Sequence, residues 1–211
     1  EYGLNEMGIH RLINPERVAA RRILRMLQVP AAQDVRDFAG GRVRLIAFRI
    51  EPGAPAAGKM LKEIAREQAR DVGLVVAVER GNKVEIPHGE SRLEAGDFVW
   101  IFCSPEEVAE AARMAGKEYF PLRRVCVFGA RAVGYHLVRD LVADDIPVKV
   151  IEPDLELCEE LAREFSGVVV LNGQAIDLKL LQEESIGDSS AFVAATADDE
   201  ENLLSALLAR K

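Results

Sequence analysis

The stretch from residue 125 to residue 152 constrains the fold more than any other part of the chain. It opens with an apolar run at 125–128, passes through a short turn with glycines at 129 and 134, and continues into a helical pattern. A second apolar run follows and ends on Glu152. A strand, a glycine turn, a helix and a second strand that closes on an acid predict a βαβ unit of the nucleotide-binding kind. In such units the helix N-terminus meets phosphate and the acid meets ribose hydroxyls.

The glycine pattern departs from the G-x-G-x-x-G fingerprint at one position. Gly129 would make the tight turn out of the strand, and Gly134 would let the helix lie close to the sheet. Arg131 replaces the middle glycine. Its side chain either blocks the approach of a pyrophosphate to the backbone or supplies a forked cation for phosphate. A Rossmann-like unit that has lost its ligand is the other interpretation.

Glu152 lies 23 residues after Gly129. A ribose-binding acid is expected about 20 residues after the first glycine, so the spacing favours that role. The alternative is an ordinary solvated strand end.

From residue 123 onward, predicted strands and helices alternate. They fall at 124–128, 132–143, 147–151, 155–165, 167–171, 177–183, 190–195 and 200–210. Alternation of this kind predicts a parallel sheet with helices on its faces. Doubly wound nucleotide folds have about five or six strands, and only four are predicted here. We therefore expect the chain to be an excerpt from a longer tandem protein.

The region before residue 120 predicts one amphipathic helix and a small α/β unit. Asn14 and Pro15 mark the start of a helix over 15–28, and residues 8–13 before it look like a fragment of strand and turn. In the α/β unit, strands are predicted at 42–50, 74–78, 84–87 and 98–103, and a helix at 58–70. Ser104 and Glu107 have the spacing of a capping box at the start of a helix that runs through Met114.

The composition limits the class of protein. With 49% apolar and 29% charged residues, the chain resembles ordinary soluble globular proteins. It has no apolar run of 18 residues and no basic leader, so we expect a cytoplasmic protein. Its three cysteines form no C-x-x-C pair and are expected to be reduced, apolar residues.

The net charge of −8 is unevenly distributed. Residues 120–211 hold 9 Lys and Arg against 17 Asp and Glu, while residues 1–119 are balanced at 18 against 18. Because phosphate backbones are bound by clustered Lys and Arg, an acidic βαβ region argues against a nucleic-acid partner.

Several motifs resemble the Trk/RCK family, the cytosolic regulators of bacterial potassium uptake systems and potassium channels. Segments similar to the C-terminal module of that family, including Gly-Lys-x-Leu and Ala-Gly-Asp elements, lie at 58–64, 75–81, 86–89 and 93–99. Segments similar to its N-terminal Rossmann module lie at 129–134, 152, 172–177 and 194–202. Residues 8–28 resemble the end of such a Rossmann module and the crossing helix after it.

The resemblance implies an α/β fold with a small α/β RCK C-terminal module followed by an incomplete, Rossmann-like, doubly wound parallel sheet. The expected domains are the tail of a preceding Rossmann module and its crossing helix at 1–33, the C-terminal module at 34–119, and the Rossmann domain at 120–211. This order is that of tandem regulatory subunits.

The function implied by the resemblance is nucleotide-responsive gating of a potassium uptake transporter, without catalysis. The regulatory ligand would be NAD(H) or ATP/ADP. The assembly would be a homo-oligomer, tetrameric for tandem proteins, docked on the inner face of the cell membrane beneath a TrkH-like potassium-transporting subunit.

The resemblance also assigns the site residues one by one. The phosphate turn would be formed by Gly129, Ala130, Arg131, Ala132, Val133 and Gly134. Glu152 would be the ribose acid, and the rim of the adenosine pocket would be Gly173, Gln174, Ala175, Ala195 and Thr196. Gln174 stands where the family often has aspartate. Together with Arg131, it leaves open a Rossmann module that binds weakly or is only structural.

An enzyme is the competing hypothesis, namely an NAD-dependent oxidoreductase whose catalytic domain lies elsewhere. Such an enzyme needs a proton donor or acceptor near the nicotinamide, and the three histidines are better explained by surface or packing roles. No metalloprotease, nucleophile-elbow or P-loop motif occurs. The acids at 198–201 could bind a cation, but their position favours capping of a helix. A small ligand between the loop at 52–58 and the turn at 87–97 is a third possibility.

Overall fold

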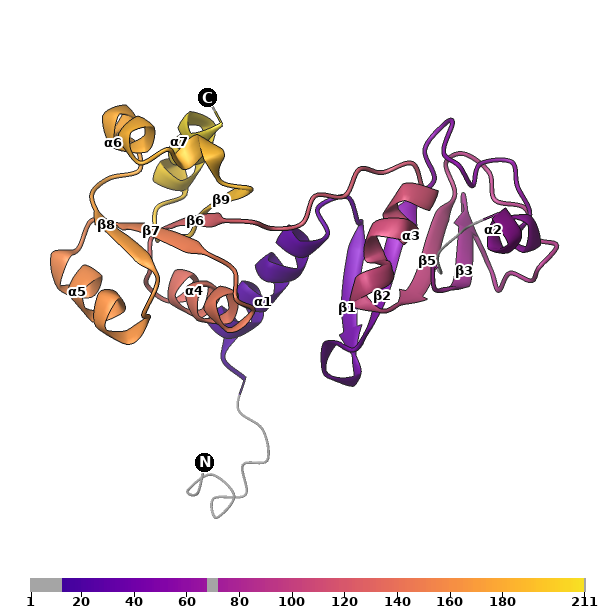
Figure 1. The fold of residues 1–211 in the computed structure, drawn as a ribbon, viewed down its shortest axis with the longest axis horizontal. Helices are drawn as coiled ribbons and strands as arrows, with labels where there is room; N and C mark the ends of the chain where they lie inside the picture. Colours follow the sequence, from indigo (N-terminus) through magenta and orange to yellow (C-terminus); the bar gives the residue numbers. More distant parts are fainter. Residues whose placement is uncertain (1–12, 68–71, 211) are drawn as a thin grey trace, which may run out of the picture. The chain divides into compact units, whose positions relative to one another are not determined.

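The computed structural model describes residues 13–67 and 72–210, which form two compact units (Figure 1). One unit runs from Arg25 to Phe120, and the other combines the described residues up to Leu24 with those from Pro121 onward. Residues 8–12 of the strand and turn predicted at 8–13 lie outside the described residues. The mixed architecture confirms the predicted α/β fold class.

The unit from Arg25 to Phe120 is built on a five-stranded antiparallel sheet with the order β1-β2-β5-β3-β4. Its strands are β1 (Asp34–Phe38), β2 (Val43–Arg49), β3 (Leu74–Arg80), β4 (Lys83–Glu85) and β5 (Phe98–Cys103). Along β5, Val99, Ile101 and Cys103 are buried and alternate with partly exposed aromatic residues. The buried residues belong to the same apolar cluster as α3 (Val108–Met114), so that helix covers the inner face of the sheet.

Two details of this unit differ from the sequence-based prediction. The edge strand β1 was not predicted, because three of its five residues are charged and only pairing with β2 makes it a strand. The predicted helix at 58–70 begins later, as α2 (Leu61–Glu67). Gly58 has a φ of +80°, which a helix excludes, and Met60 forms a β-bridge with Arg92. The last predicted residues of that helix, 68–70, lie outside the described part.

The second unit contains a parallel sheet with the order β8-β7-β6-β9. Its strands are β6 (Val125–Phe128), β7 (Val148–Glu152), β8 (Val169–Asn172) and β9 (Ala191–Ala194). Its helices are α4 (Val133–Ala143), α5 (Leu155–Glu164), α6 (Leu178–Glu183) and α7 (Asp199–Ala209). This confirms the predicted Rossmann-like parallel sheet. The strand order reverses between β6 and β9, and the carboxyl ends of strands at such a reversal are where ligands of open α/β sheets bind.

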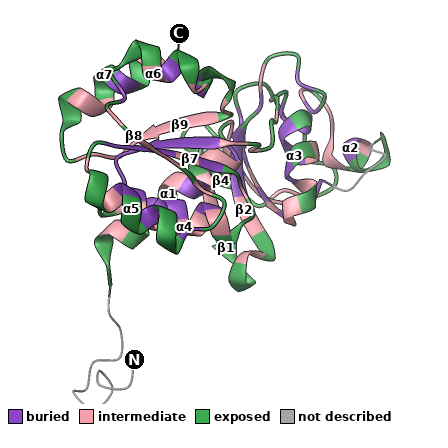
Figure 2. Cartoon of the chain, turned by 60° about the vertical axis from the view of Figure 1, so that its left-hand side comes forward, coloured by how far each residue is buried: buried purple, intermediate pink, exposed green. Residues whose placement is uncertain are grey.

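Helices cover both faces of this sheet. Helices α4 and α5 lie on one face and α6 and α7 on the other, with the outward sides of α6 and α7 exposed (Figure 2). All four residues of β6 are buried, as expected for a central strand covered on both faces. On the face of α4 lies the first half of α1 (Pro15–Gln28), whose Arg21 is 3.8 Å from Asp140 of α4.

Capping side chains begin the helices where the sequence predicted them. Asn14 Oδ1 accepts a hydrogen bond from the Arg17 N–H at 2.7 Å, and Glu107 Oε2 accepts one from the Ser104 N–H at 2.6 Å. Asp198 Oδ1 accepts from the Glu201 N–H at 2.9 Å, so the acids at 198–201 begin α7 as the capping interpretation predicted. Across residues 13–67 and 72–210, no group of three or more His, Cys, Asp or Glu could hold a metal ion. No helix in the same ranges has the length and apolar character needed to cross a membrane.

Candidate functional site

The turn between β6 and α4 contains two glycines at which a larger residue would force the backbone to move. Gly129 has a φ of +82°, and a Cβ there would lie 2.7 Å from Thr196 Cγ2 and 2.9 Å from the Thr196 nitrogen. A Cβ on Gly134 would lie 1.9 Å from the carbonyl oxygen of Gly129. The first glycine therefore lets the turn approach the loop after β9, and the second lets α4 approach the turn.

The middle of the turn differs from what the fingerprint suggests. Arg131, at the position of the missing glycine, does not have a positive φ, whereas Ala132 has a φ of 43° and a ψ of −104°. The strained residue is thus one position further along the chain. Within the described part, no intramolecular acceptor is found for the N–H groups of Arg131, Ala132 and Val133. Three free donors at the positive end of α4 are suited to an anion.

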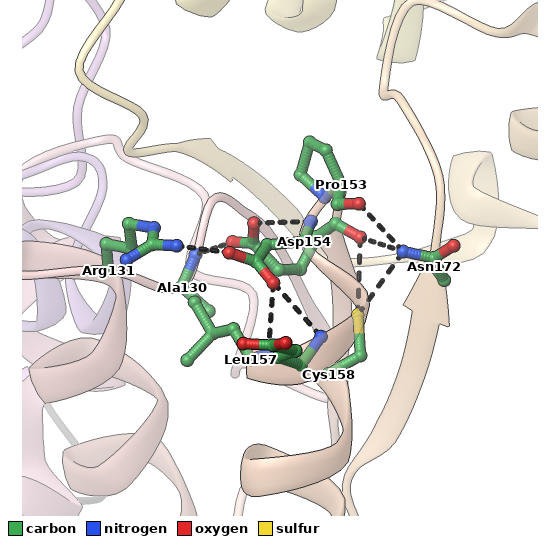
Figure 3. A network of polar contacts seen from close by, with 9 residues as sticks. Ala130, Arg131, Pro153, Asp154, Leu157, Cys158 and Asn172 are labelled. Carbon is green, nitrogen blue, oxygen red and sulfur yellow. Dashed lines mark hydrogen bonds and ion pairs between the residues drawn. The ribbon is translucent and has the colours of Figure 1, made fainter.

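The Glu152 carboxylate lies behind the turn and is only 5% exposed. Its Oε2 accepts a hydrogen bond from the Ala130 N–H at 2.8 Å, and its Oε1 accepts one from the Asp154 N–H at 3.1 Å (Figure 3). Glu152 is therefore not a solvated strand end. Each carboxylate oxygen keeps a second acceptor position, which a hydroxyl donor could use.

Three further residues make polar contacts at the end of β7, and sequence reasoning had assigned none of them a role in the site. Asn172 Nδ2 donates to the carbonyl oxygens of Glu152 and Pro153, at 3.1 and 2.9 Å. The Cys158 thiol donates to the same Glu152 carbonyl at 3.3 Å. Asp154 forms an ion pair with Arg131 across the mouth of the turn. The sequence signal for Asp154 was its position immediately before a helical pattern, which suits an N-cap.

Asp154 also begins helix α5. Its Oδ1 accepts from the N–H groups of Glu156 and Leu157, at 3.0 and 3.3 Å, while its Oδ2 contacts Arg131. The hydrogen bond from the Leu157 backbone and the charge of Arg131 lower the pKa of Asp154, so it carries a negative charge at neutral pH.

The predicted rim residues follow the two edge strands of the sheet, β8 and β9, and differ in their access to a ligand. The Gly173 N–H donates to the Glu152 carbonyl at 3.1 Å, and the Gln174 side chain is exposed. Ala175 is fully buried and packs in the core, so its methyl group does not form a rim. Ala175 could contact a ligand only through its backbone N–H and carbonyl groups.

On the other side of the turn, Ala195 and Thr196 follow β9. The Ala195 N–H donates to the Phe128 carbonyl at 2.8 Å, which extends the ladder between β9 and β6. Asn202 accepts from the Thr196 N–H and hydroxyl at 2.9 and 2.8 Å and donates to the Thr196 carbonyl at 3.1 Å. Asn202 therefore holds this loop against Gly129, another role that sequence reasoning missed.

Comparison with known families agrees with this architecture. The TrkA-C domain matches residues 45–116, and the TrkA-N domain matches residues 125–211. The chain therefore combines a TrkA-C domain with a following TrkA-N domain. The "Trk system potassium uptake protein TrkA homolog 2" of Methanosarcina mazei is 33% identical over 98% of this chain and 46% of its own length. The "Trk system potassium uptake protein TrkA" of Halomonas elongata is 34% identical over 95% of this chain and 44% of its own. The chain thus spans a little under half the length of these TrkA-family relatives.

Solved structures show the same fold. A crystal structure of the GsuK RCK domain superposes with a TM-score of 0.53 at 19% identity, over 95% of this chain and 42% of that one. The GsuK channel bound to NAD superposes with a TM-score of 0.52 at 19% identity, over 95% of this chain and 35% of that one. At this identity the likeness to RCK domains concerns the fold alone.

The TrkA-N site combines donors and acceptors in a definite arrangement. The free amides at the start of α4 and the exposed Arg131 guanidinium provide donors on one side. The Glu152 and Asp154 carboxylates provide acceptors on the other. A ligand with an anionic group and vicinal hydroxyls would use both sides, and a nucleotide has both groups.

Proposed function

We propose that this chain is part of a nucleotide-responsive regulator of potassium uptake, and that its TrkA-N unit binds an adenine nucleotide. The observation that carries the proposal is the buried Glu152 carboxylate beside three free amides at the start of α4. Burying a carboxylate costs desolvation free energy, even when backbone N–H groups donate to it. Here the buried carboxylate lies beside the turn where phosphate binds in comparable folds. The site residues are Gly129 to Gly134, Glu152, Gly173 to Ala175, Ala195 and Thr196.

Relatives support the biological side of the proposal. Those reported above carry the name of the Trk system for potassium uptake, and one structural neighbour is a channel bound to NAD. We therefore favour NAD(H) as the regulatory ligand and keep ATP and ADP as alternatives. The full-length protein would form a homo-oligomer, a tetrameric ring, on the cytoplasmic side of a TrkH-like potassium-transporting subunit.

Regulation of this kind needs no chemistry. A nucleotide that binds one arrangement of the TrkA-N and TrkA-C units more tightly than another shifts the population by that difference in affinity. The proposed role is therefore non-enzymatic. An NAD-dependent oxidoreductase remains the alternative, and it predicts turnover where the regulator predicts only binding.

The test is a calorimetric titration of the chain with NADH, NAD, ATP and ADP. We expect saturable binding of at least one nucleotide and no consumption of NADH with time. Glu152→Gln replaces one acceptor oxygen by a donor, and the loss of a hydrogen bond to a charged group corresponds to a roughly tenfold or greater loss of affinity. Glu156→Gln is the matched control, because Glu156 is exposed in the first turn of α5.

Two results would contradict the proposal. A folded chain that binds none of the four nucleotides would make this TrkA-N unit a structural one. Steady oxidation of NADH would favour the enzyme. For the potassium role, the full-length protein should restore potassium uptake to a bacterial strain that lacks its own regulator, and Glu152→Gln should change that uptake while Glu156→Gln does not.

A further inference from the structure

The ion pair between Arg131 and Asp154 joins the two sides of the candidate site. Arg131 comes from the phosphate turn, and Asp154 is the N-cap residue of α5, two residues after Glu152. Both side chains are accessible to solvent, with 70% of the arginine and 38% of the aspartate side chain exposed. The guanidinium group therefore contacts a carboxylate at the edge of the turn in which phosphate is proposed to bind (Figure 3).

We infer that Asp154 is a specificity-determining residue of this site, because it occupies Arg131 until a phosphate of the nucleotide takes its place. The inference rests on the nucleotide-binding function proposed above and adds the exchange of partners. Arg131 is then the phosphate-binding side chain that compensates for the missing glycine. The ligand class is an adenine nucleotide with a phosphate or pyrophosphate at the turn, as distinct from a free nucleoside.

The two oxygens of Asp154 divide their partners in a way that permits the exchange. Oδ1 accepts from the backbone of Glu156 and Leu157, and Oδ2 alone contacts Arg131. When Arg131 leaves, the cap of α5 stays in place. Breaking the ion pair between Arg131 and Asp154 costs little free energy, since exposed ion pairs are weak. The planar guanidinium can then bind a phosphate through two parallel hydrogen bonds.

The free amides lie on the same turn as Arg131. A phosphate held by the N–H groups at the start of α4 is within the reach of a side chain that begins at position 131. The side chain need only rotate, because it is largely exposed and contacts no polar group other than Asp154 within the described residues. Asp154 and the phosphate then compete for one cation.

The competition predicts opposite effects for two substitutions. Asp154→Asn removes the competing charge while keeping a residue that caps helices as well as aspartate does. ADP should then bind about two to five times more tightly, the range that corresponds to an exposed ion pair. Arg131→Ala should weaken ADP binding by about tenfold, the value of a charge-assisted contact. Adenosine, which lacks phosphate, should bind equally to all three proteins.

The experiment is a calorimetric titration of wild-type chain, Asp154→Asn, Arg131→Ala and the double variant with ADP, adenosine and inorganic pyrophosphate. The control is Asp177→Asn, because Asp177 caps α6 through the same two backbone positions and has no ion pair in the described structure. It should leave all three affinities unchanged. Circular dichroism confirms folding, and Asp154→Ser serves as a second capping variant if Asp154→Asn is unstable.

The outcomes separate this inference from the proposed function. Tightening by Asp154→Asn that disappears in the Arg131→Ala background supports the exchange. Unchanged ADP affinity in Asp154→Asn, or tightening that persists without Arg131, overturns it while nucleotide binding stands. In another outcome, pyrophosphate affinity responds to the two substitutions as predicted for ADP, while ADP binds no more tightly than pyrophosphate and adenosine does not bind. In that case the exchange stands and the nucleotide function fails. If no probe binds any folded variant, both fail.

Discussion

Gly134 offers the sharpest test of how the phosphate turn is built. It lies at the second position of α4, where the backbone has no positive φ, so alanine is compatible with its conformation. Alanine is also favoured over glycine in a helix by about 1 kcal/mol. Propensity alone therefore predicts that Gly134→Ala stabilises the TrkA-N unit.

The contacts of the added methyl group predict the reverse. The Cβ would lie 1.9 Å from the Gly129 carbonyl oxygen and 2.9 Å from its carbon, and both are backbone atoms. Relief of these contacts requires the backbone of α4 or of the turn to move, because a Cβ within 3.0 Å of a backbone atom is not tolerated. Overpacking of this kind lowers the free energy of unfolding by up to about 3 kcal/mol, and we take this upper value because both contacts are with backbone atoms. Subtracting the gain in propensity leaves a net loss of about 2 kcal/mol.

The assay is urea unfolding at 25 °C, followed by far-ultraviolet circular dichroism and by the fluorescence of Trp100. This is the only tryptophan of the chain and lies in β5 of the TrkA-C unit, so fluorescence reports on that unit separately. With an m-value of about 2 kcal/mol/M, the transition of the TrkA-N unit should move down by about 1 M. The matched control is Gly187→Ala, where a Cβ has no neighbour within 4 Å and φ is not positive.

We expect Gly187→Ala to leave the transition unchanged or to raise it slightly. A Gly134→Ala variant as stable as Gly187→Ala would refute the close approach of α4 to the turn. The same result would remove the structural reason for the second glycine of the motif.

Three further predictions follow from other sites. Ala132→Gly should stabilise the TrkA-N unit by about 1 kcal/mol in the same unfolding assay, because it relieves a strained non-glycine conformation at some entropic cost, and a lower midpoint would contradict this. In the TrkA-C unit, burial raises the pKa of Asp97, but hydrogen bonds from Arg80, both at 2.7 Å, and from the Glu94 backbone outweigh it, so the pKa lies below its usual value. That stabilisation is present above about pH 4 and is lost as the pH falls through the lower pKa of the folded state. Asp97→Asn should lower the free energy of unfolding by about 2 kcal/mol at pH 7 and reduce its dependence on acid pH, so that the variant and the wild-type protein are equally stable at low pH. Burial raises the pKa of the Cys103 thiol to about 11 and of the Cys126 thiol to about 12, so a thiol reagent at pH 8 should label them only after denaturation, and rapid labelling of the native chain would contradict their burial.

Much of the fold was predictable because its signals are local. The apolar runs that became β6 to β9 lie at nearly the predicted positions, since parallel strands with helices on both faces of the sheet are continuous apolar segments. Capping residues such as Ser104 and Asp198 marked helix starts because their hydrogen bonds reach only a few residues along the chain. β1 had no such signal, because its charged residues form a strand only beside β2.

The candidate site was predictable in part. Spacing placed Gly129, Gly134 and Glu152 near one another, since the carboxyl ends of parallel strands meet at one edge of the sheet. It did not distinguish Ala175, whose methyl group is in the core, from its exposed neighbour Gln174. Nor did it show that the strained backbone position is Ala132, one residue after the missing glycine.

By itself, the sequence determined the order of strands and helices in the TrkA-N unit, including its βαβ unit, and the acidic character of that half, because periodicity, spacing and charge are properties of the chain. Only the tertiary structure decided what the side chains of the turn contact. Arg131 meets Asp154, Glu152 is held by the Ala130 amide, and Asn202 fixes Thr196. Each of the first two contacts joins residues more than 20 positions apart, and such contacts form only when the strands pack into one sheet.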